Sequence, residues 1–300
     1  MRRAPVFLIA LVVMSVALGL AGCGGGTRQV PAIRTSAGDL RPMVYVALGD
    51  SYTGAPRVGR RISVPCNRTD LNYPHLFAAD RETSPSGEVN LIDVSCGGAR
   101  IRDLTHRQKP VVARQLAAVR ADADLVTVAV GGNDVGIMSL VGVCLTKPAA
   151  CQRRRDTTVA GLKKMRTDLV AVLRRVKAKA PHATIVVIGY PEILPSTGRC
   201  LKAGRTTLTL ARGALNRIAI AQRNAATQAG VGFLDPRSVT RGHGLCTKDP
   251  WIALRTTATS QQYHPTEAEQ RAVATALEHR IGTQLAATRV GLPQPGHSSK

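Results

Sequence analysis

Hydrophobic residues along the chain form short continuous runs that alternate with segments of helical spacing. Five runs rich in Val, Ile and Leu predict strands, over residues 43–49, 90–94, 124–130, 183–190 and 231–235. Apolar positions at a period near 3.6 predict helices over residues 70–80, 111–121, 155–180, 203–229 and 266–286, whereas residues 53–69 show no period and predict a long loop. Continuous apolar runs are typical of strands that are buried on both faces. The pattern therefore predicts one α/β domain over residues 42–288, with a parallel sheet covered by helices on both sides.

The N-terminal residues have the composition of an export signal. Residues 1–22 begin with Arg2 and Arg3 and continue as an apolar stretch that ends directly before Cys23. Small residues before a cysteine resemble a bacterial lipobox, so we expect Cys23 to be diacylated and to anchor the protein to a membrane. An ordinary signal peptide or a membrane-anchor helix is the alternative.

The segments on either side of the predicted domain lack hydrophobic periodicity. Residues 23–41 are rich in Gly, Ser, Thr and Pro, which predicts a flexible tether. Residues 289–300 contain Pro, Gly and Ser and predict a disordered tail.

Composition limits the function classes. Hydrophobic residues make up 44% of the chain and aromatic residues 3%, so the core must consist mainly of aliphatic side chains. The formal net charge of +22 permits binding to anionic surfaces. However, the basic residues are scattered and lack interleaved aromatic residues, and those of 155–180 fit the solvated face of a helix. We therefore expect no nucleic-acid partner.

The cysteine count agrees with export. Seven cysteines less Cys23 leave six, an even number that predicts three disulfides with 15 possible connectivities: Cys66, Cys96, Cys144, Cys151, Cys200 and Cys246. Cys144 and Cys151 flank a Lys-Pro turn and are expected to pair. No spacing is Cys-x-x-Cys, so a zinc site is not expected. The sequence suggests no other metal site and contains no phosphate-binding loop, so no cofactor is expected.

Small polar turns follow three of the predicted strands. They are Gly49-Asp50-Ser51, Gly97-Gly98 and Gly131-Gly132-Asn133-Asp134. Alone, Gly-Asp-Ser is more often only a turn. In a parallel sheet, however, these turns lie at one edge and can converge. Ser51 would then be a nucleophile, and its oxyanion donors would be the N–H groups of Ser51 and Gly98 and the side-chain amide of Asn133.

A serine nucleophile needs a base, and His264 is the best candidate among the seven histidines. It precedes Pro265 at the start of the last predicted helix, where Thr266 and Glu269 have the spacing of a capping box. A histidine held rigidly at a helix start is well placed to accept a proton. A lone histidine would more often be structural, but the three polar turns reverse that expectation.

These four blocks, in this order, resemble the SGNH or GDSL-type hydrolase superfamily, and in particular its secreted actinobacterial-type esterases and lipases with three disulfides. The resemblance implies a flavodoxin-like three-layer α/β/α fold and hydrolysis of carboxylic esters through an acyl-serine intermediate. It implies Ser51 as nucleophile, His264 as base, and Ser51, Gly98 and Asn133 as the oxyanion hole. It also implies the disulfides Cys66–Cys96, Cys144–Cys151 and Cys200–Cys246.

The sequence departs from the superfamily pattern at one position. The superfamily commonly has Asp three residues before the histidine, whereas this chain has Gln261. We expect a Ser–His dyad in which a backbone carbonyl near Gln261 or Gln262 orients the imidazole. Asp249 is a less favoured substitute.

The sequence analysis thus predicts a monomeric esterase or lipase that acts on acyl esters or lipids. It predicts export and a lipid anchor on the extracytoplasmic side of the cell membrane. A carbohydrate O-acetyl esterase on the same scaffold and a non-catalytic surface-binding lipoprotein are the alternatives.

Overall fold

The computed structural model describes residues 41–83, 87–254 and 261–289. The predicted export signal (1–22), the lipidation site Cys23, the tether apart from Arg41 and the tail beyond residue 289 lie outside the described residues. The described residues belong to one compact unit.

A parallel sheet of five strands forms the centre of this unit. The strand order is β4-β1-β5-β6-β7, and every neighbouring pair is parallel. The strands are β1 (Met43–Gly49), β4 (Val89–Asp93), β5 (Leu125–Ala129), β6 (Thr184–Ile188) and β7 (Gly232–Leu234). All five lie within two residues of the predicted runs.

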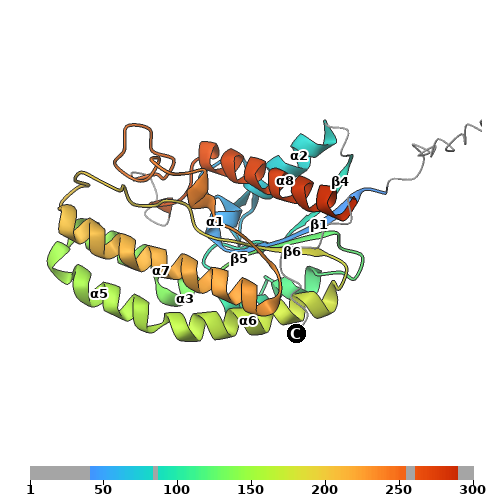
Figure 1. Ribbon diagram of the computed structural model, residues 1–300, viewed down its shortest axis with the longest axis horizontal. Coiled ribbons are helices and arrows are strands. Elements are labelled where there is room, and N and C mark those ends of the chain that lie inside the picture. The colour runs from blue at the N-terminus through green and yellow to red at the C-terminus, as the bar shows by residue number, and fades with distance from the viewer. Residues whose placement is uncertain (1–40, 84–86, 255–260, 290–300) are drawn as a thin grey trace, which may run out of the picture. The chain divides into compact units, whose positions relative to one another are not determined.

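Helices cover both faces of the sheet, which confirms the predicted α/β/α class (Figure 1). On one face lie α2 (Tyr73–Glu82) and α8 (Glu267–Arg289), and on the other lie α5 (Pro148–Ala160), α6 (Leu162–Lys179) and α7 (Arg205–Ala229). The short helices are α1 (Ser51–Gly54), α3 (Gly132–Val135) and α4 (Ile137–Thr146), and the 3₁₀ turns are η1 (Ile101–Leu104), η2 (Gln115–Ala118) and η3 (Pro236–Ser238).

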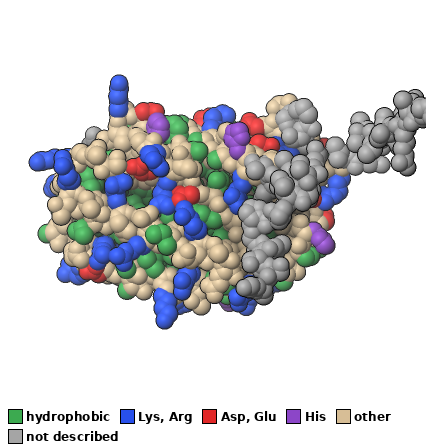
Figure 2. Space-filling model, viewed as in Figure 1, with side chains coloured by type: hydrophobic (Ala, Val, Ile, Leu, Met, Phe, Trp, Pro, Cys, Tyr) green, Lys and Arg blue, Asp and Glu red, His purple; other side chains and the backbone are tan. Residues whose placement is uncertain are grey.

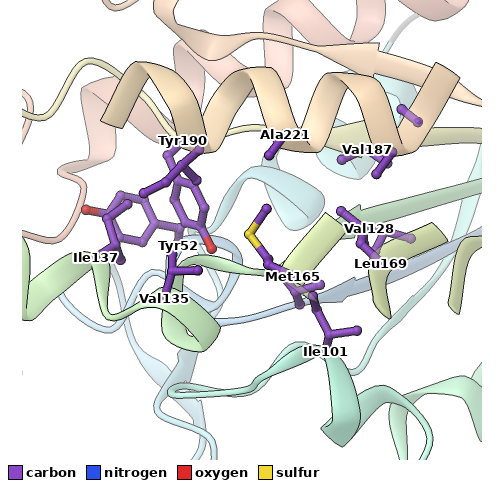
Figure 3. Packing of buried hydrophobic residues seen from close by; sticks show 14 of the residues in the cluster. Tyr52, Ile101, Val128, Val135, Ile137, Met165, Leu169, Val187, Tyr190 and Ala221 are labelled. Carbon is purple, nitrogen blue, oxygen red and sulfur yellow. The ribbon is translucent and has the colours of Figure 1, made fainter. Parts of the chain in front are cut away.

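The two faces of each strand contribute to two different hydrophobic cores because successive side chains alternate in direction. From β1, Val46 and Leu48 enter the core under α5, α6 and α7, whereas Tyr45 and Ala47 enter the core under α2 and α8. Figure 3 shows the larger core, with Val128 and Val187 from the sheet and Met165, Leu169 and Ala221 from the helices. This double burial explains why the strands appear in the sequence as continuous apolar runs.

The structure differs from the predicted elements in several segments. Residues 53–69 contain a small hairpin of β2 (Arg61–Ser63) and β3 (Arg68–Thr69) in place of a loop without regular structure. Residues 111–121 contain only the turn η2 in place of the predicted helix, and the first residue of this turn, Gln115, is hydrogen-bonded to Gly49 at the end of β1. The predicted helix over 155–180 is two helices, with Gly161 ending α5 and beginning α6. The helix α4 was not predicted.

The three disulfides have the pairing that the family resemblance implies. Cys66 is bonded to Cys96, Cys144 to Cys151, and Cys200 to Cys246. The Cys144–Cys151 bond joins α4 to α5 across the Lys-Pro turn, as expected from their spacing.

The part of the chain that the structure describes has neither a membrane-spanning helix nor a clustered metal site. None of its helices is long and apolar enough to cross a membrane. It contains no group of three or more His, Cys, Asp or Glu residues that could hold a metal ion. Lys and Arg side chains are spread over the face seen in Figure 2, with acidic side chains among them.

Candidate active site

The backbone that carries Ser51 is held from two sides. The Gln115 side chain accepts a hydrogen bond from the Gly49 N–H (2.8 Å) and donates one to the Gly49 carbonyl (2.9 Å). A Cβ on Gly49 would lie 2.1 Å from Thr53 Oγ1, so the turn into α1 requires glycine. Asp50 then caps α1 by accepting from the Tyr52 N–H at 2.9 Å. Ser51 is therefore the first residue of a helix at the carboxyl end of β1, with its N–H outside the helical hydrogen bonds.

His264 contacts Ser51 across the sheet edge. Its Nε2 lies 2.7 Å from Ser51 Oγ, and its Nδ1 lies 2.9 Å from the Gln262 carbonyl oxygen. A carbonyl oxygen only accepts, so Nδ1 carries the ring hydrogen of the neutral imidazole and Nε2 accepts from the Ser51 hydroxyl. The expected carbonyl contact to the imidazole is present, and it comes from Gln262.

The backbone of Gln261 also acts on His264 and raises the pKa of the imidazole, whereas the Gln261 side chain and Asp249 have other partners. The Gln261 side chain donates to the Pro56 carbonyl at 3.1 Å, and so ties the histidine loop to the segment after α1. Asp249 accepts from the Trp251 indole at 3.1 Å and lies 3.2 Å from His243. Asp249 is thus not the orienting group.

The environment of His264 favours the neutral imidazole. Burial lowers its pKa below the usual 6.5, and the nearby positive charge of Arg57 lowers it further, while the backbone carbonyls oppose this shift. Only 4% of His264 is exposed. Arg57 is half-buried, and its Nε has no hydrogen-bond partner among the described residues. An unprotonated imidazole beside a hydroxyl is the arrangement that a general base requires.

The predicted capping box at the start of α8 is wrong. Thr266 Oγ1 has no partner in the described structure, and its N–H donates to the Trp251 carbonyl at 2.8 Å. The Glu269 carboxyl group is buried, and one of its oxygens accepts from Gln270 instead. Backbone pairing holds this segment, because Ala253 bonds to both Tyr263 and His264. A neighbouring loop thus replaces the local side-chain cap.

Tyr52 fixes the residue before His264. Its hydroxyl donates to the Tyr263 carbonyl at 2.6 Å, and Tyr263 has a left-handed backbone with φ of 63°. The Tyr52 ring lies 5.5 Å from the imidazole. It also lies 5.0 Å from the Tyr190 ring and at right angles to it, and Figure 3 shows these two tyrosines side by side.

The turn after β4 lies beside the Ser51 turn. The Cys96 N–H donates to the Gly49 carbonyl at 3.0 Å, which brings Gly98 to the same edge. Gly98 has φ of +79°, a conformation that favours glycine, and it is exposed. The predicted convergence of the first two turns is therefore present.

The turn after β5 is bonded to both of the others. The Asn133 amide donates to the Ala99 carbonyl at 3.0 Å and makes a longer contact of 3.4 Å with Asp50. Asp134 accepts from the Ile101 N–H at 3.1 Å. The side chains of these two neighbours thus fasten the second turn to the third.

A buried network behind the nucleophile was missing from the sequence prediction. The Tyr190 hydroxyl donates to Asp50 at 2.6 Å and accepts from the Gly132 N–H at 2.7 Å. Burial raises the pKa of Asp50 to about 7, although the bonds from Tyr190 and Tyr52 oppose this shift. The available signal was that Tyr190 ends a predicted strand, and so lies at the same sheet edge as Ser51.

Comparisons with known proteins agree with this geometry. The model of the GDSL-like Lipase/Acylhydrolase family matches residues 47–272. "Lipase 1" of Streptomyces coelicolor is 34% identical over 278 residues, which cover 88% of this chain and 92% of that protein. The extracellular lipase from Streptomyces rimosus superposes with a TM-score of 0.70 at 30% identity, covering 79% of this chain and 99% of that one. Phospholipase A1 from Streptomyces albidoflavus gives a TM-score of 0.69 at 30% identity, with coverage of 80% and 99%. The chain belongs to the GDSL-like lipase/acylhydrolase family and is a hydrolase of carboxylic esters.

Proposed function

We propose that Ser51 and His264 form a catalytic dyad that hydrolyses acyl esters of lipids through an acyl-serine intermediate. The observation that carries this proposal is the 2.7 Å hydrogen bond between Ser51 Oγ and the unprotonated Nε2 of His264. The Gln262 carbonyl holds the ring in the tautomer that this role needs.

The reaction has two halves. Ser51 Oγ attacks the ester carbonyl carbon while His264 Nε2 takes the hydroxyl proton, and His264 then protonates the departing alkoxide. Water next attacks the acyl-serine with His264 again as base, which releases the fatty acid and restores Ser51. A neutral carbonyl stabilises the imidazolium less than an aspartate would. We therefore expect a lower turnover than that of a Ser-His-Asp enzyme.

The oxyanion of the tetrahedral intermediate would be held by three donors. These are the N–H groups of Ser51 and Gly98 and the amide of Asn133, and each such donor is typically worth about 10²–10³ in kcat. The long 3.4 Å contact between Asn133 and Asp50 supports this role, because an oxyanion can compete for that weakly held hydrogen.

We further propose that the enzyme is a monomeric lipoprotein. Residues 1–22 would be removed on export, Cys23 would be diacylated, and residues 23–41 would tether a catalytic domain of residues 42–288, with 289–300 as a tail. Disulfides persist in oxidising compartments, and one relative is described as an extracellular lipase, so both observations support export.

The relatives' names support a lipid substrate, since they include lipases and a phospholipase A1. The test uses residues 24–300, oxidised, with p-nitrophenyl acetate, butyrate and palmitate as substrates. Ser51→Ala and His264→Ala are each expected to lower kcat by roughly 10⁴-fold or more. Ser139→Ala, on the exposed side of α4, is the control and should leave kcat unchanged.

A fluorophosphonate probe provides the second readout. It should label the parent chain at Ser51 and leave Ser51→Ala unlabelled. Undiminished turnover or labelling in Ser51→Ala would rule out the dyad. Hydrolysis of p-nitrophenyl acetate without hydrolysis of the butyrate and palmitate esters would indicate an enzyme for small acetyl esters and not for lipids.

A further inference from the structure

Two turns near the candidate active site expose valine at their tips. Val64 begins the turn after β2, where the Asn67 N–H donates to the Val64 carbonyl at 3.3 Å, and it is 73% exposed. Val111 lies in the turn closed by the bond from the Val112 N–H to the Lys109 carbonyl, and it is 80% exposed. Turn tips usually carry Gly, Asn, Asp or Ser. Neither exposed valine contributes to the described cores.

These two turns are fastened to each other. Lys109 Nζ donates to the Pro65 carbonyl, so the 109–112 turn lies against the 64–67 turn. Val112 packs on the Cys66–Cys96 disulfide, which joins the hairpin to the end of β4. The two valine tips therefore belong to one rigid rim.

The rim adjoins the candidate oxyanion hole. The Gln108 amide donates to the Gly97 carbonyl at 2.8 Å, and the Gly97 N–H donates to the Cys66 carbonyl at 2.8 Å. Gly97 directly precedes Gly98. We define the docking face as Ile62, Val64 and Val111. The segments that carry it are thus hydrogen-bonded to the turn that contains Gly98.

The two segments that carry the docking face are positively charged. Residues 56–69 and 104–121 contain no Asp, Glu, Phe, Tyr or Trp. Their exposed cations are Arg60, Arg61, Arg107, Lys109, Arg114 and Arg120. Arg60 is ion-paired with Asp70 at 3.1 Å and Arg120 with Asp122, whereas the remaining four cations have no ion-pair partner among the described residues.

We propose that the docking face inserts into the headgroup region of an anionic phospholipid bilayer and presents the lipid ester to Ser51. Exposed aliphatic tips on segments rich in exposed Lys and Arg are complementary to an apolar layer beneath negative headgroups. Without aromatic side chains the face has no stacking platform for nucleic acid. This inference rests on the proposed function only for the presentation of the ester, because binding to the bilayer does not require Ser51.

The first experiment measures binding without turnover. Ser51→Ala in residues 24–300 is sedimented with vesicles of phosphatidylcholine alone, or of equal parts of phosphatidylcholine and phosphatidylglycerol. Adding Val64→Ser and Val111→Ser should lower the partition constant for the mixed vesicles at least about tenfold. Each methylene-sized group that is lost from the bilayer lowers this constant about fourfold. Val239→Ser, at a 39% exposed valine outside the face, is the matched control and should bind like the parent.

Charge is tested in the same way. Arg61→Gln with Arg114→Gln should weaken partition into the mixed vesicles by about fivefold per cation. Arg174→Gln with Arg175→Gln, exposed on α6, makes the same change of net charge and should have a smaller effect. Equal losses for the two pairs would mean that only the net charge matters, and the docking face would be rejected.

The remaining outcomes separate this inference from the proposed function. With Ser51 intact, the Val64/Val111 variant should keep its activity on soluble p-nitrophenyl butyrate and lose activity on the mixed vesicles. Equal partition of the variant and its parent, or equal binding to phosphatidylcholine alone, would overturn the docking face even if the enzyme is active. Vesicle binding that depends on the face, in a chain that shows no Ser51-dependent turnover, would uphold the docking face and reject the dyad.

Discussion

The hydrogen bond from Tyr52 to the Tyr263 carbonyl allows a direct test of how the chain holds its base. At 2.6 Å, this bond fixes the residue before His264, whose left-handed φ of 63° is unfavourable for a bulky side chain. Tyr52→Phe keeps the ring that packs beside the imidazole and removes only the hydroxyl. The perturbation therefore acts on the position of the histidine loop.

The magnitude follows from the groups that lose their partners. A carbonyl left without its donor costs about 1–3 kcal/mol, and relaxation of a non-glycine residue from the left-handed region releases strain of a similar size. The unpaired carbonyl and the release of backbone strain therefore both favour a displacement of the loop that carries Tyr263 and His264. Because a shift of about 1 Å in a catalytic group can cost about 10²-fold in rate, we expect Tyr52→Phe to lower kcat by roughly 10- to 100-fold with little change in KM.

The assay measures kcat and KM on p-nitrophenyl butyrate together with the free energy of unfolding in urea. Tyr45→Phe is the matched control, because the Tyr45 hydroxyl is also buried and bonds to Thr127 at 2.9 Å in the core under α2 and α8. Tyr45→Phe should lose stability and keep its kcat. Wild-type kcat in Tyr52→Phe, or an equal fall of kcat in both variants, would refute the reasoning.

Three other groups give predictions of the same kind. The pKa of His264 is lowered mainly by burial and to a smaller extent by the positive charge of Arg57. Arg57→Gln removes that charge, so the acid limb of the kcat/KM profile should move to higher pH. An unmoved limb would contradict this. Burial raises the pKa of Glu269 from the usual 4.5 to about 8, so the native state favours the protonated form, and stability should fall by about 1.4 kcal/mol per unit as pH rises between these values. Glu269→Gln should make this slope less steep in urea titrations at several pH values, with a remaining slope from Asp50, whose pKa is also raised, and parallel slopes would exclude Glu269 as a source. Tyr190→Phe leaves the Gly132 N–H without its acceptor and should cost about 1–3 kcal/mol of unfolding free energy, whereas an unchanged urea midpoint would show that the network adds nothing.

The sequence alone determined the sheet and the position of its chemistry. Strands buried on both faces need apolar side chains at every position, so β1 and β5 stand out without any tertiary information. The carboxyl ends of parallel strands share one edge of the sheet, so the sequence pattern predicted that the turns at Ser51, Gly98 and Asn133 lie close together. The hydrophobic period did not show that Gly161 divides the predicted helix 155–180 into two helices. It also predicted a helix over 111–121, where the structure has only the short turn η2.

Only the tertiary structure decided what supports the candidate dyad. The Gln262 carbonyl that orients His264 is a backbone group, and every residue type has one, so no sequence pattern marks it. Tyr190 and Asp50 are 140 residues apart, and their bond exists because β1 and β6 end at the same edge with a hydrophobic core behind them. The failed capping box at Thr266 has the same cause, because the backbone of residues 251–253 pairs with this segment in place of the Glu269 side chain. Side-chain type and period are local properties of a chain, whereas burial and hydrogen-bond partners depend on which segments the fold brings together.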